Sequence, residues 1–179
     1  MLGSLVTVPA LDRPELLAPP VASALLGLPR DQVLVAEIDP ELADTAAFCE
    51  RYGVALGQSA NCVVVAGRRG ETTTSAACVV LATTRADVNG LVRRRLDARK
   101  ASFAPMDVAV EASGMEYGGI TPVGLPPAWP LLLDAAVLDQ PWVVVGSGLR
   151  RSKLVLPGAL LATLPGAEVV HGLALPVPG

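Results

Sequence analysis

Apolar and polar positions near the start of the chain predict a strand followed by a helix. Residues 32–39 alternate with the two-residue period of a strand. Asp39 and Pro40 then favour a helix start, because aspartate caps a helix and proline fits its first turn. The helical spacing continues through Leu42, Ala46, Cys49 and Gly53.

The middle of the chain predicts a hairpin and a second helix. Apolar runs at residues 61–66 and 75–83 flank the polar residues 67–74, which is typical of a β-hairpin with its turn in the polar part. A helix is expected to begin at Asp87, because its charged residues face away from an apolar face formed by Val88, Leu91, Val92 and Leu96.

The remaining elements are shorter. We expect an extended segment at 101–104, a helix at 106–113 that ends at Gly114, a short helix at 157–164, and strands at 131–133, 142–145, 154–156 and 168–173. Strands and helices mix without strict alternation, which favours a single α/β (α+β) domain on a mixed sheet. We expect this domain to span residues 31–179 and the proline-rich residues 1–30 to form an extension packed on its core.

The composition predicts a compact soluble protein. Hydrophobic residues make up 51% of the 179 residues and the net charge is −3, whereas disordered chains combine low hydrophobicity with high net charge. No uninterrupted apolar run reaches the roughly 18 residues that cross a bilayer, and residues 1–11 lack the basic start of a secretory signal. We therefore expect a cytoplasmic location and no membrane partner.

The cysteines and the single histidine favour neither a metal site nor a catalytic triad. Cys49, Cys62 and Cys78 form no CxxC pair. Cys62 and Cys78 stand in apolar runs, where a reduced cysteine behaves as a small hydrophobic side chain. His171 would have to be the only base of any triad. We expect no metal and no cofactor.

Charge is distributed unevenly along the chain. Residues 1–50 hold eight acidic and two basic residues, and residues 51–179 hold nine acidic and twelve basic residues. Most basic residues fall into two clusters, Arg93, Arg94, Arg95, Arg99 and Lys100 in one, and Arg150, Arg151 and Lys153 in the other. Such clusters can bind phosphates; the alternative is a solvated helix face. An aromatic content of 3% favours phosphate contacts over base stacking.

Glycine and proline are concentrated in residues 114–130, where they occupy eight of seventeen positions. Glycine lets a backbone approach a ligand and proline stiffens the flanks, so residues 118–122 can present fixed N–H donors to an anion or an oxyanion. A second small-residue turn at residues 146–148 is predicted to form the opposite wall of the same cleft. The alternative is that both loops need glycine only for their shape.

Several segments carry a resemblance to a known family. They are residues 113–126 (SGMEYGGITPVGLP), 130–134 (PLLLD), 143–156 (VVVGSGLRRSKLVL), 156–174 and, upstream, 59–66 (SANCVVVA). Together they resemble the YbaK and prolyl-tRNA-editing family of aminoacyl-tRNA deacylases, over about residues 20–175. The resemblance implies a partly barrel-like mixed sheet with surrounding helices. It also implies hydrolysis of wrongly charged tRNA, by free-standing proteins or by inserts in prolyl-tRNA synthetase.

The resemblance implies roles for individual residues. The backbone amides that would hold the aminoacyl carbonyl and its developing oxyanion belong to the family's GxxxP loop, here Gly118, Gly119, Ile120, Thr121 and Pro122. The second turn would lie beside the α-amino group and the terminal ribose, and Asp134 would orient the loop. The expected substrate-binding residues are Asn61, Lys100, Asp134, Gly146, Ser147, Gly148, Arg150 and Lys153.

Two positions depart from the family pattern. Ala60 stands where many members carry a lysine that contacts the tRNA end, and Asn61 follows it, as in other relatives with Ala-Asn. Lys153 stands at a position that is acidic in the family, so it reverses a charge. Lys100 is a candidate to supply a nearby charge instead.

The leading hypothesis is a trans-editing hydrolase whose partner is the acceptor end of mischarged tRNA. Water would attack the ester with help from the ribose hydroxyl, and the pocket would admit small side chains such as Ala, Ser or Cys and exclude larger ones. An aminoacyl-tRNA synthetase is a further candidate partner, and no DNA partner is expected. The alternatives are a non-catalytic module that binds aminoacyl-tRNA or an amino acid, and a hydrolase of small esters or amides.

Overall fold

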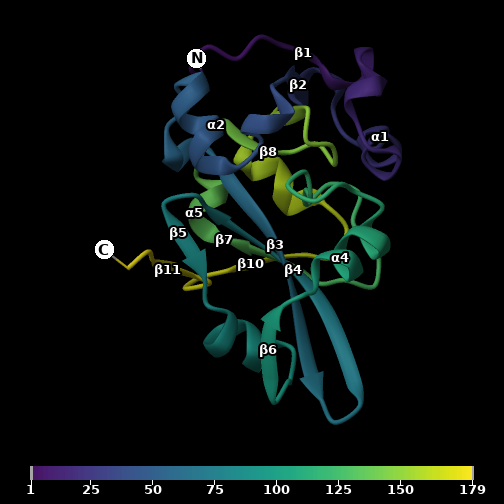
Figure 1. Cartoon of the computed structure of the whole chain (residues 1–179), viewed down its shortest axis with the longest axis vertical. Helices are drawn as coiled ribbons and strands as arrows, with labels where there is room; N and C mark the ends of the chain where they lie inside the picture. Colours follow the sequence, from purple (N-terminus) through teal and green to yellow (C-terminus); the bar gives the residue numbers. More distant parts are fainter. Residues whose placement is uncertain (1, 179) are drawn as a thin grey trace.

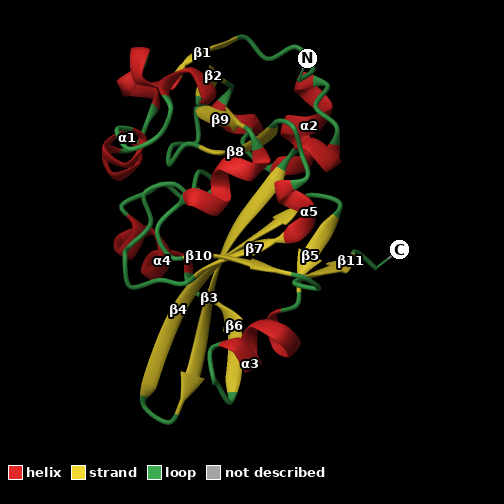
Figure 2. Ribbon diagram, turned by 180° about the vertical axis from the view of Figure 1, so that it is seen from behind, coloured by secondary structure: helices red, strands yellow, loops and turns green. Residues whose placement is uncertain are grey.

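Three β-sheets form the framework of the protein, and short helices surround them (Figures 1 and 2). The computed structural model describes residues 2–178. In chain order the strands are β1 (Thr7–Pro9), β2 (Leu34–Glu37), β3 (Ala60–Arg69), β4 (Thr72–Leu81), β5 (Thr84–Ala86), β6 (Lys100–Phe103), β7 (Leu131–Asp134), β8 (Val143–Gly146), β9 (Ser152–Leu156), β10 (Ala167–Val170) and β11 (Ala174–Pro176).

The helices are all short. The α-helices are α1 (Pro19–Leu25), α2 (Thr45–Tyr52), α3 (Arg93–Arg95), α4 (Met106–Ser113) and α5 (Ala135–Leu138). A π-helix (Val88–Val92) precedes α3, and 3-10 turns occupy Ala10–Asp12, Pro14–Leu16, Arg30–Gln32, Pro40–Leu42, Leu56–Gln58 and Gly158–Thr163. Within residues 2–178, no helix has both the length and the apolar character that crossing a membrane requires.

The two larger sheets confirm the expectation of a mixed α/β fold. One is antiparallel with the order β1-β2-β9-β8, and the other has the order β10-β7-β4-β3-β6, in which β7 runs parallel to both of its neighbours. Strands β5 and β11 form a third sheet. A single bridge between Ser59 and Val144 connects the start of β3 with β8. The described strands keep free sheet edges and do not close into a barrel.

The predicted hairpin is longer than the apolar pattern indicates. Strands β3 and β4 pair from Ala60 with Leu81 to Arg69 with Thr72, so the turn lies at Gly70 and Glu71 rather than across residues 67–74. The tip of the hairpin projects into solvent, and residues 68–74 are exposed (Figure 1). Polar residues therefore continue both strands without interrupting them, and only the buried half carries an apolar signal.

The helix predicted after Pro40 is divided into two pieces. The side chain of Asp39 accepts a hydrogen bond from the N–H of Glu41, as expected of a cap, but only a 3-10 turn follows. Helix α2 begins at Thr45 and ends at Gly53, whose φ of 65° lies in the left-handed region. Of the four residues at helical spacing, Ala46 and Cys49 lie in α2 and Gly53 ends it, and the α-helix begins five residues later than predicted.

The helices predicted from Asp87 and at 106–113 are confirmed, and the short helix predicted at 157–164 is a 3-10 helix, Gly158–Thr163. The side chain of Asp87 accepts hydrogen bonds from the N–H groups of Gly90 and Leu91, which satisfies two of the donors at a helix start. The helix that follows begins with a π turn and then continues as α3. Helix α4 has the predicted bounds and ends at Gly114 in the left-handed conformation.

The N-terminal residues pack into the main apolar cluster. Leu16, Val21 and Leu25 are almost completely buried and share this cluster with Leu133 of β7 and Leu154 of β9. Strand β1 also pairs with β2 and forms an edge of the antiparallel sheet. Strands β1, β5 and β11 were not predicted, because three residues are too few to show an alternating pattern.

The two glycine-rich loops lie backbone to backbone. The carbonyl of Gly119 accepts a hydrogen bond from the N–H of Gly148 at 2.7 Å, and the carbonyl of Gly148 accepts one from Glu116 at 2.8 Å. A Cβ at Gly146 would overlap the carbonyl oxygens of Gly119 and Ile120. Because the obstructing atoms belong to the backbone, only glycine fits. The loops therefore form one continuous wall, rather than the opposite walls that the sequence predicts.

A network of buried hydroxyl groups holds the second glycine-rich loop, residues 146–148, in place. The hydroxyl groups of Ser147 and Ser152 lie 2.7 Å apart, and that of Ser152 donates to the carbonyl of Leu16 at 2.6 Å. The N–H of Ala18 donates to the carbonyl of Ser147 at 3.2 Å. Both serines are completely buried, and each hydroxyl has a partner. The N-terminal segment thus holds the turn that supports the first loop.

Replacing Gly146 by alanine tests this contact. We expect Gly146→Ala to lower the free energy of unfolding by about 3 kcal/mol, because overpacking against backbone forces the two loops apart. Gly57→Ala is the control, since a Cβ at Gly57 meets no atom within 4 Å, and we expect it to change stability by less than about 0.5 kcal/mol. Chemical denaturation measures both variants, and equal stabilities would contradict the close contact.

Candidate functional site

A cavity of about 540 Å³ lies where β3 of one large sheet meets β8 and β9 of the other. Its remaining walls come from the start of α2, the connection from β6 to α4, and the loop that follows α4. The volume is that of a small-molecule pocket. The sequence-predicted site residues that line it are Asn61, Gly118, Ile120, Gly146 and Lys153.

Two residues that line the cavity, Gly118 and Ile120, have backbone N–H groups without an acceptor in the part of the chain that the structure describes. The N–H of Gly119 between them donates to the carbonyl of Glu116 at 2.9 Å. Gly118 has a φ of 82°, a left-handed conformation that glycine adopts without strain. Unpaired and immobile N–H groups of this kind can bind a carbonyl oxygen or an oxyanion.

The other residues of the predicted loop lie behind this wall. Gly119, Thr121 and Pro122 are buried and do not line the cavity. A Cβ at Gly119 would lie 2.7–2.8 Å from the backbone of Leu149. The hydroxyl of Thr121 is buried without a hydrogen-bond partner in the described chain, which typically costs about 1–3 kcal/mol. These three residues support the loop from within.

Lys153 places a buried positive charge in the cavity wall. The residue is 8% exposed, its Nζ donates to the carbonyl of Ala43 at 2.9 Å, and this nitrogen lies 5.3 Å from the centre of the Phe48 ring. Burial lowers the pKa of Lys153 to about 8, and the positive charge of Arg150 contributes to the decrease. The ammonium group is therefore still mainly charged at neutral pH and can attract a carbonyl oxygen or an anion in the cavity.

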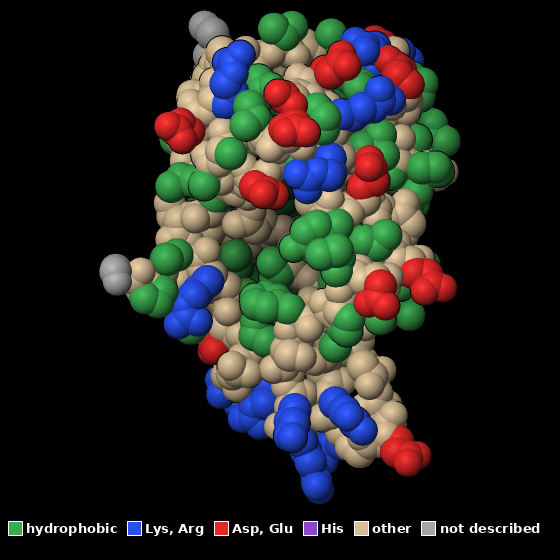
Figure 3. Space-filling view, viewed as in Figure 1, with side chains coloured by type: hydrophobic (Ala, Val, Ile, Leu, Met, Phe, Trp, Pro, Cys, Tyr) green, Lys and Arg blue, Asp and Glu red, His purple; other side chains and the backbone are tan. Residues whose placement is uncertain are grey.

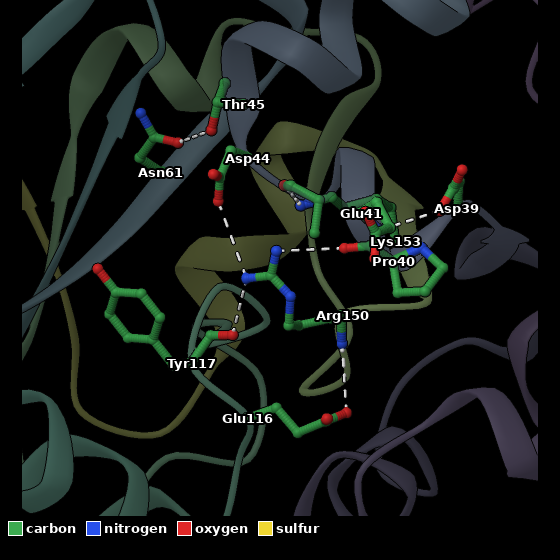
Figure 4. A network of polar contacts seen from close by, with 11 residues as sticks. Asp39, Pro40, Glu41, Asp44, Thr45, Asn61, Glu116, Tyr117, Arg150 and Lys153 are labelled. Atoms are coloured by element: carbon green, nitrogen blue, oxygen red, sulfur yellow. Dashed lines mark hydrogen bonds and ion pairs between the residues drawn. The ribbon is translucent and has the colours of Figure 1, made fainter.

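Arg150 connects three segments at the edge of the cavity (Figure 4). Its guanidinium donates to the carbonyls of Tyr117 at 3.3 Å and Pro40 at 3.2 Å, and it lies 3.8 Å from the carboxylate of Asp44. Its backbone N–H donates to the carboxylate of Glu116 at 3.3 Å. Since these protein groups occupy the side chain, Arg150 holds the loops in place.

The sequence suggested that Arg150, Arg151 and Lys153 form a phosphate-binding cluster. In the structure they do not form one patch. Lys153 faces the cavity, and Arg150 is bound to carbonyl groups. Arg151 donates to the carbonyl of Glu15 in the N-terminal segment. Arg150 and Arg151 lie in the turn between β8 and β9, and Lys153 lies in β9, so the three side chains reach different surroundings.

Three further predicted residues lie in different surroundings. The side-chain oxygen of Asn61 accepts a hydrogen bond from the hydroxyl of Thr45 at 2.6 Å at the cavity wall. Lys100 lies outside this cavity, because β6 pairs with the outer half of β3, where Lys100 is opposite Arg68. Asp134 does not contact the glycine-rich loop; its carboxylate caps α5 by accepting from Ala136 and also accepts from Ala174.

Several residues of the cavity were not predicted from the sequence. They include Asp44, Thr45, Ser59, Phe103, Met106 and Tyr117. Tyr117 stands directly before Gly118, so the glycine-rich segment was a signal for it. Asp44 and Thr45 were missed because the sequence places the helix start five residues too early. Phe103 carried no signal, because the edge strand β6 brings it to the cavity by pairing with β3.

Neither the single histidine of the chain nor the cysteine that lines the cavity is available as a general base. His171 is exposed between β10 and β11 and does not line the cavity. Cys62 lines it, but burial raises the pKa of this thiol far above its usual value, so it stays protonated at neutral pH. Ala60, at the position of the family lysine, also lines the cavity and provides no charge.

Comparison with known proteins assigns the family. The chain matches the model of the aminoacyl-tRNA editing domain over residues 39–164. A solved structure described as a candidate trans-editing enzyme for prolyl tRNA synthetase is 24% identical, with a TM-score of 0.71 over 86% of this chain and 94% of that one. Another, described as hypothetical protein APE2540, is 22% identical, with a TM-score of 0.73 over 87% and 99% of the two chains.

These structural likenesses support the fold, and the family model covers most of the chain and all of the cavity's sheet strands. No curated protein sequence matches the chain. The match begins at Asp39 and ends at Leu164, so it includes both glycine-rich loops and Lys153. The protein therefore belongs to the aminoacyl-tRNA editing domain family.

Proposed function

We propose that the protein is a deacylase that hydrolyses the ester bond of mischarged tRNA in trans. The observation that carries the proposal is the pair of unpaired N–H groups of Gly118 and Ile120 in the cavity wall. The contact between the two loops holds these donors before any substrate arrives, so little reorganisation is needed when charge develops on an ester oxygen.

The reaction in this cavity is addition of water to the ester carbonyl. The carbonyl oxygen becomes negatively charged in the tetrahedral intermediate, and the N–H groups of Gly118 and Ile120 donate to it. The bond between the carbonyl carbon and the ribose oxygen then breaks, the ribose oxygen takes up one proton of the attacking water, and the amino acid leaves as a carboxylate while the other proton passes to solvent. The free vicinal hydroxyl of the ribose orients the water, since neither His171 nor Cys62 is placed as a base.

Lys153 supports the same step electrostatically. Its ammonium group keeps one hydrogen bond to Ala43 and has further N–H donors for a ligand in the cavity. Because Lys153 is almost completely buried, water screens its charge little, and this charge stabilises a developing oxyanion more strongly than an exposed one would. Lys153 also provides a positive charge in the cavity where Ala60 provides none.

Selection among amino acids follows from size. Valine, isoleucine and methionine side chains line the cavity, which also has to accommodate the terminal ribose. A pocket of fixed volume rejects a side chain that is too large better than one that is too small. We therefore propose that small residues such as alanine, serine or cysteine are removed from tRNA. A cytoplasmic location and association with an aminoacyl-tRNA synthetase complete the proposal.

The deacylation rates of a panel of mischarged tRNAs test the proposed function. We expect acceleration over buffer for small aminoacyl groups and no acceleration for large ones. If no member of the panel is hydrolysed faster than in buffer although tRNA binds tightly, the protein is the non-catalytic binding module instead. Turnover of small esters with no turnover of any charged tRNA would favour the third hypothesis.

A substitution at Gly118 tests the backbone donors. We expect Gly118→Ala to lower the deacylation rate by about a hundred- to a thousandfold, because a Cβ at this left-handed position displaces the N–H groups. The new Cβ meets the end of the Arg150 side chain, which can move aside, and it also strains the backbone at a φ of 82°. Gly57→Ala is the matched control and should retain the wild-type rate. Equal rates for both variants, measured in single turnover, would contradict the role of the loop.

The stability of Lys153→Met as a function of pH tests the buried charge. The pKa of Lys153 is about 8 in the folded protein and 10.5 ordinarily, so between these values the unfolded chain binds more protons and the wild type gains stability as the pH rises. The decrease corresponds to about 3 kcal/mol. We expect urea unfolding to show this gain, relative to Lys153→Met, between pH 8 and 10.5. Parallel pH curves for the two proteins would show that the charge is not buried.

A further inference from the structure

A basic surface lies near the tip of the β3–β4 hairpin, at the end of the molecule opposite the N-terminal segment (Figure 1). It combines residues from the tip of β3, from α3 and from β6, which lie side by side in Figures 1 and 2. Figure 3 shows Lys and Arg side chains gathered at this end of the molecule. The basic surface consists of Arg68, Arg69, Arg93, Arg94, Arg95, Arg99 and Lys100.

Most of these charges are not neutralised by the protein. Arg69 pairs with Asp97 at 2.6 Å, and Arg95 pairs with Glu168. The other five basic residues have no carboxylate within ion-pair distance among residues 2–178. They are Arg68, Arg93, Arg94, Arg99 and Lys100. Four of them surround a second cavity of about 590 Å³, into which Thr73 and Ser102 also project. Uncompensated cations around a hollow fit the phosphates of a nucleic acid backbone.

Exposed aromatic and apolar side chains stand at the mouth of the first cavity. Phe103 is 63% exposed, Tyr117 is 54% exposed, and Met106 is similarly exposed, although all three line the cavity. Figure 3 shows apolar side chains beside a hollow, above the basic end. The sequence argued against base stacking because aromatic residues are few, but two of the six lie where an unpaired base would enter. Aromatic side chains are the usual stacking partners of unpaired bases.

Strand β6 joins the two features. Lys100, Ala101 and Ser102 line the basic cavity, and the next residue, Phe103, lines the first cavity. On the neighbouring strand β3, Arg68 borders the basic cavity and Asn61 the first one. These two residues are seven positions apart, about 23 Å along the strand, and the two cavities adjoin between them, at Val64 and Ala66. A ligand that reaches both cavities is therefore an elongated polyanion with an unstacked end.

We propose that the basic surface and the aromatic mouth form one RNA-binding track. The phosphates of an RNA helix lie on the basic surface, and its unpaired 3′ end follows β6 and stacks on Phe103 and Tyr117 before its terminal ribose enters the cavity. The proposal rests on the proposed function and adds to it the path of the RNA. It assigns Phe103 a binding role and gives Lys100, which lies outside the catalytic cavity, a role in binding phosphate.

Binding of an uncharged RNA hairpin tests the track. Two probes are compared by fluorescence anisotropy over a range of KCl concentrations: a hairpin with an unpaired 3′ tail, and the same hairpin with a blunt end. The triple variant Arg94→Gln/Arg99→Gln/Lys100→Gln should bind both probes more weakly. It should also reduce the slope of log affinity against log salt by about 3. Arg13→Gln/Arg30→Gln/Arg51→Gln removes the same charge from residues outside the basic surface and should preserve the slope.

Phe103→Ala separates stacking from charge. It should lower the affinity for the tailed hairpin by about 5- to 150-fold and leave the affinity for the blunt hairpin unchanged. Leu26→Ala, at an apolar side chain that is 77% exposed, should affect neither probe. The track is overturned if the two triple variants reduce the slope equally, or if Phe103→Ala weakens both probes alike or neither. Because the probes carry no ester, binding without deacylation would refute the proposed function alone, and deacylation without these effects would refute the track alone.

Discussion

The approach of two backbones at Gly146 is the contact on which the site depends. There the second turn touches the carbonyl groups of Gly119 and Ile120 with no side chain between them. The turn is held by the buried hydroxyl of Ser147, which contacts that of Ser152, and the hydroxyl of Ser152 donates to the carbonyl of Leu16 in the N-terminal segment. A chain of backbone contacts thus extends from Leu16 to the unpaired N–H groups of the cavity. The backbone contact at Gly146 and the hydrogen bonds of the two serines therefore fix the position of the N–H groups of Gly118 and Ile120.

The cavity combines this rigid backbone with a charge that is costly to bury. Lys153 lies almost without solvent, and its single protein hydrogen bond goes to the carbonyl of Ala43. Such a group lowers stability near neutral pH, and a stability cost of this kind is typical of residues that serve binding or catalysis. The unpartnered hydroxyl of Thr121 adds a second cost beside the same loop. Both costs occur within the segments that the family model matches.

Sequence reasoning located most strands and the loops because their signals are local. The apolar runs predicted β3, β4, β7, β8 and β9, and the dense glycine and proline residues pointed to the loop at Gly118. Two assignments failed because the outcome depends on pairing partners. Lys100 is carried away from the cavity by the register of β6 with β3, and Asp134 finds its partners in α5 and β11. The burial of Lys153, unlike its charge, depends on residues that are distant in the sequence.

The most direct test of the account is a crystal structure of the protein with a hydrolysis-resistant amide analogue of an aminoacylated 3′-terminal adenosine. The account predicts that the carbonyl oxygen of the analogue lies within hydrogen-bond distance of the N–H groups of Gly118 and Ile120, and that the analogue occupies the cavity beside Lys153. An analogue bound in this cavity with its carbonyl oxygen pointing away from both N–H groups, or bound elsewhere on the protein, would contradict the account.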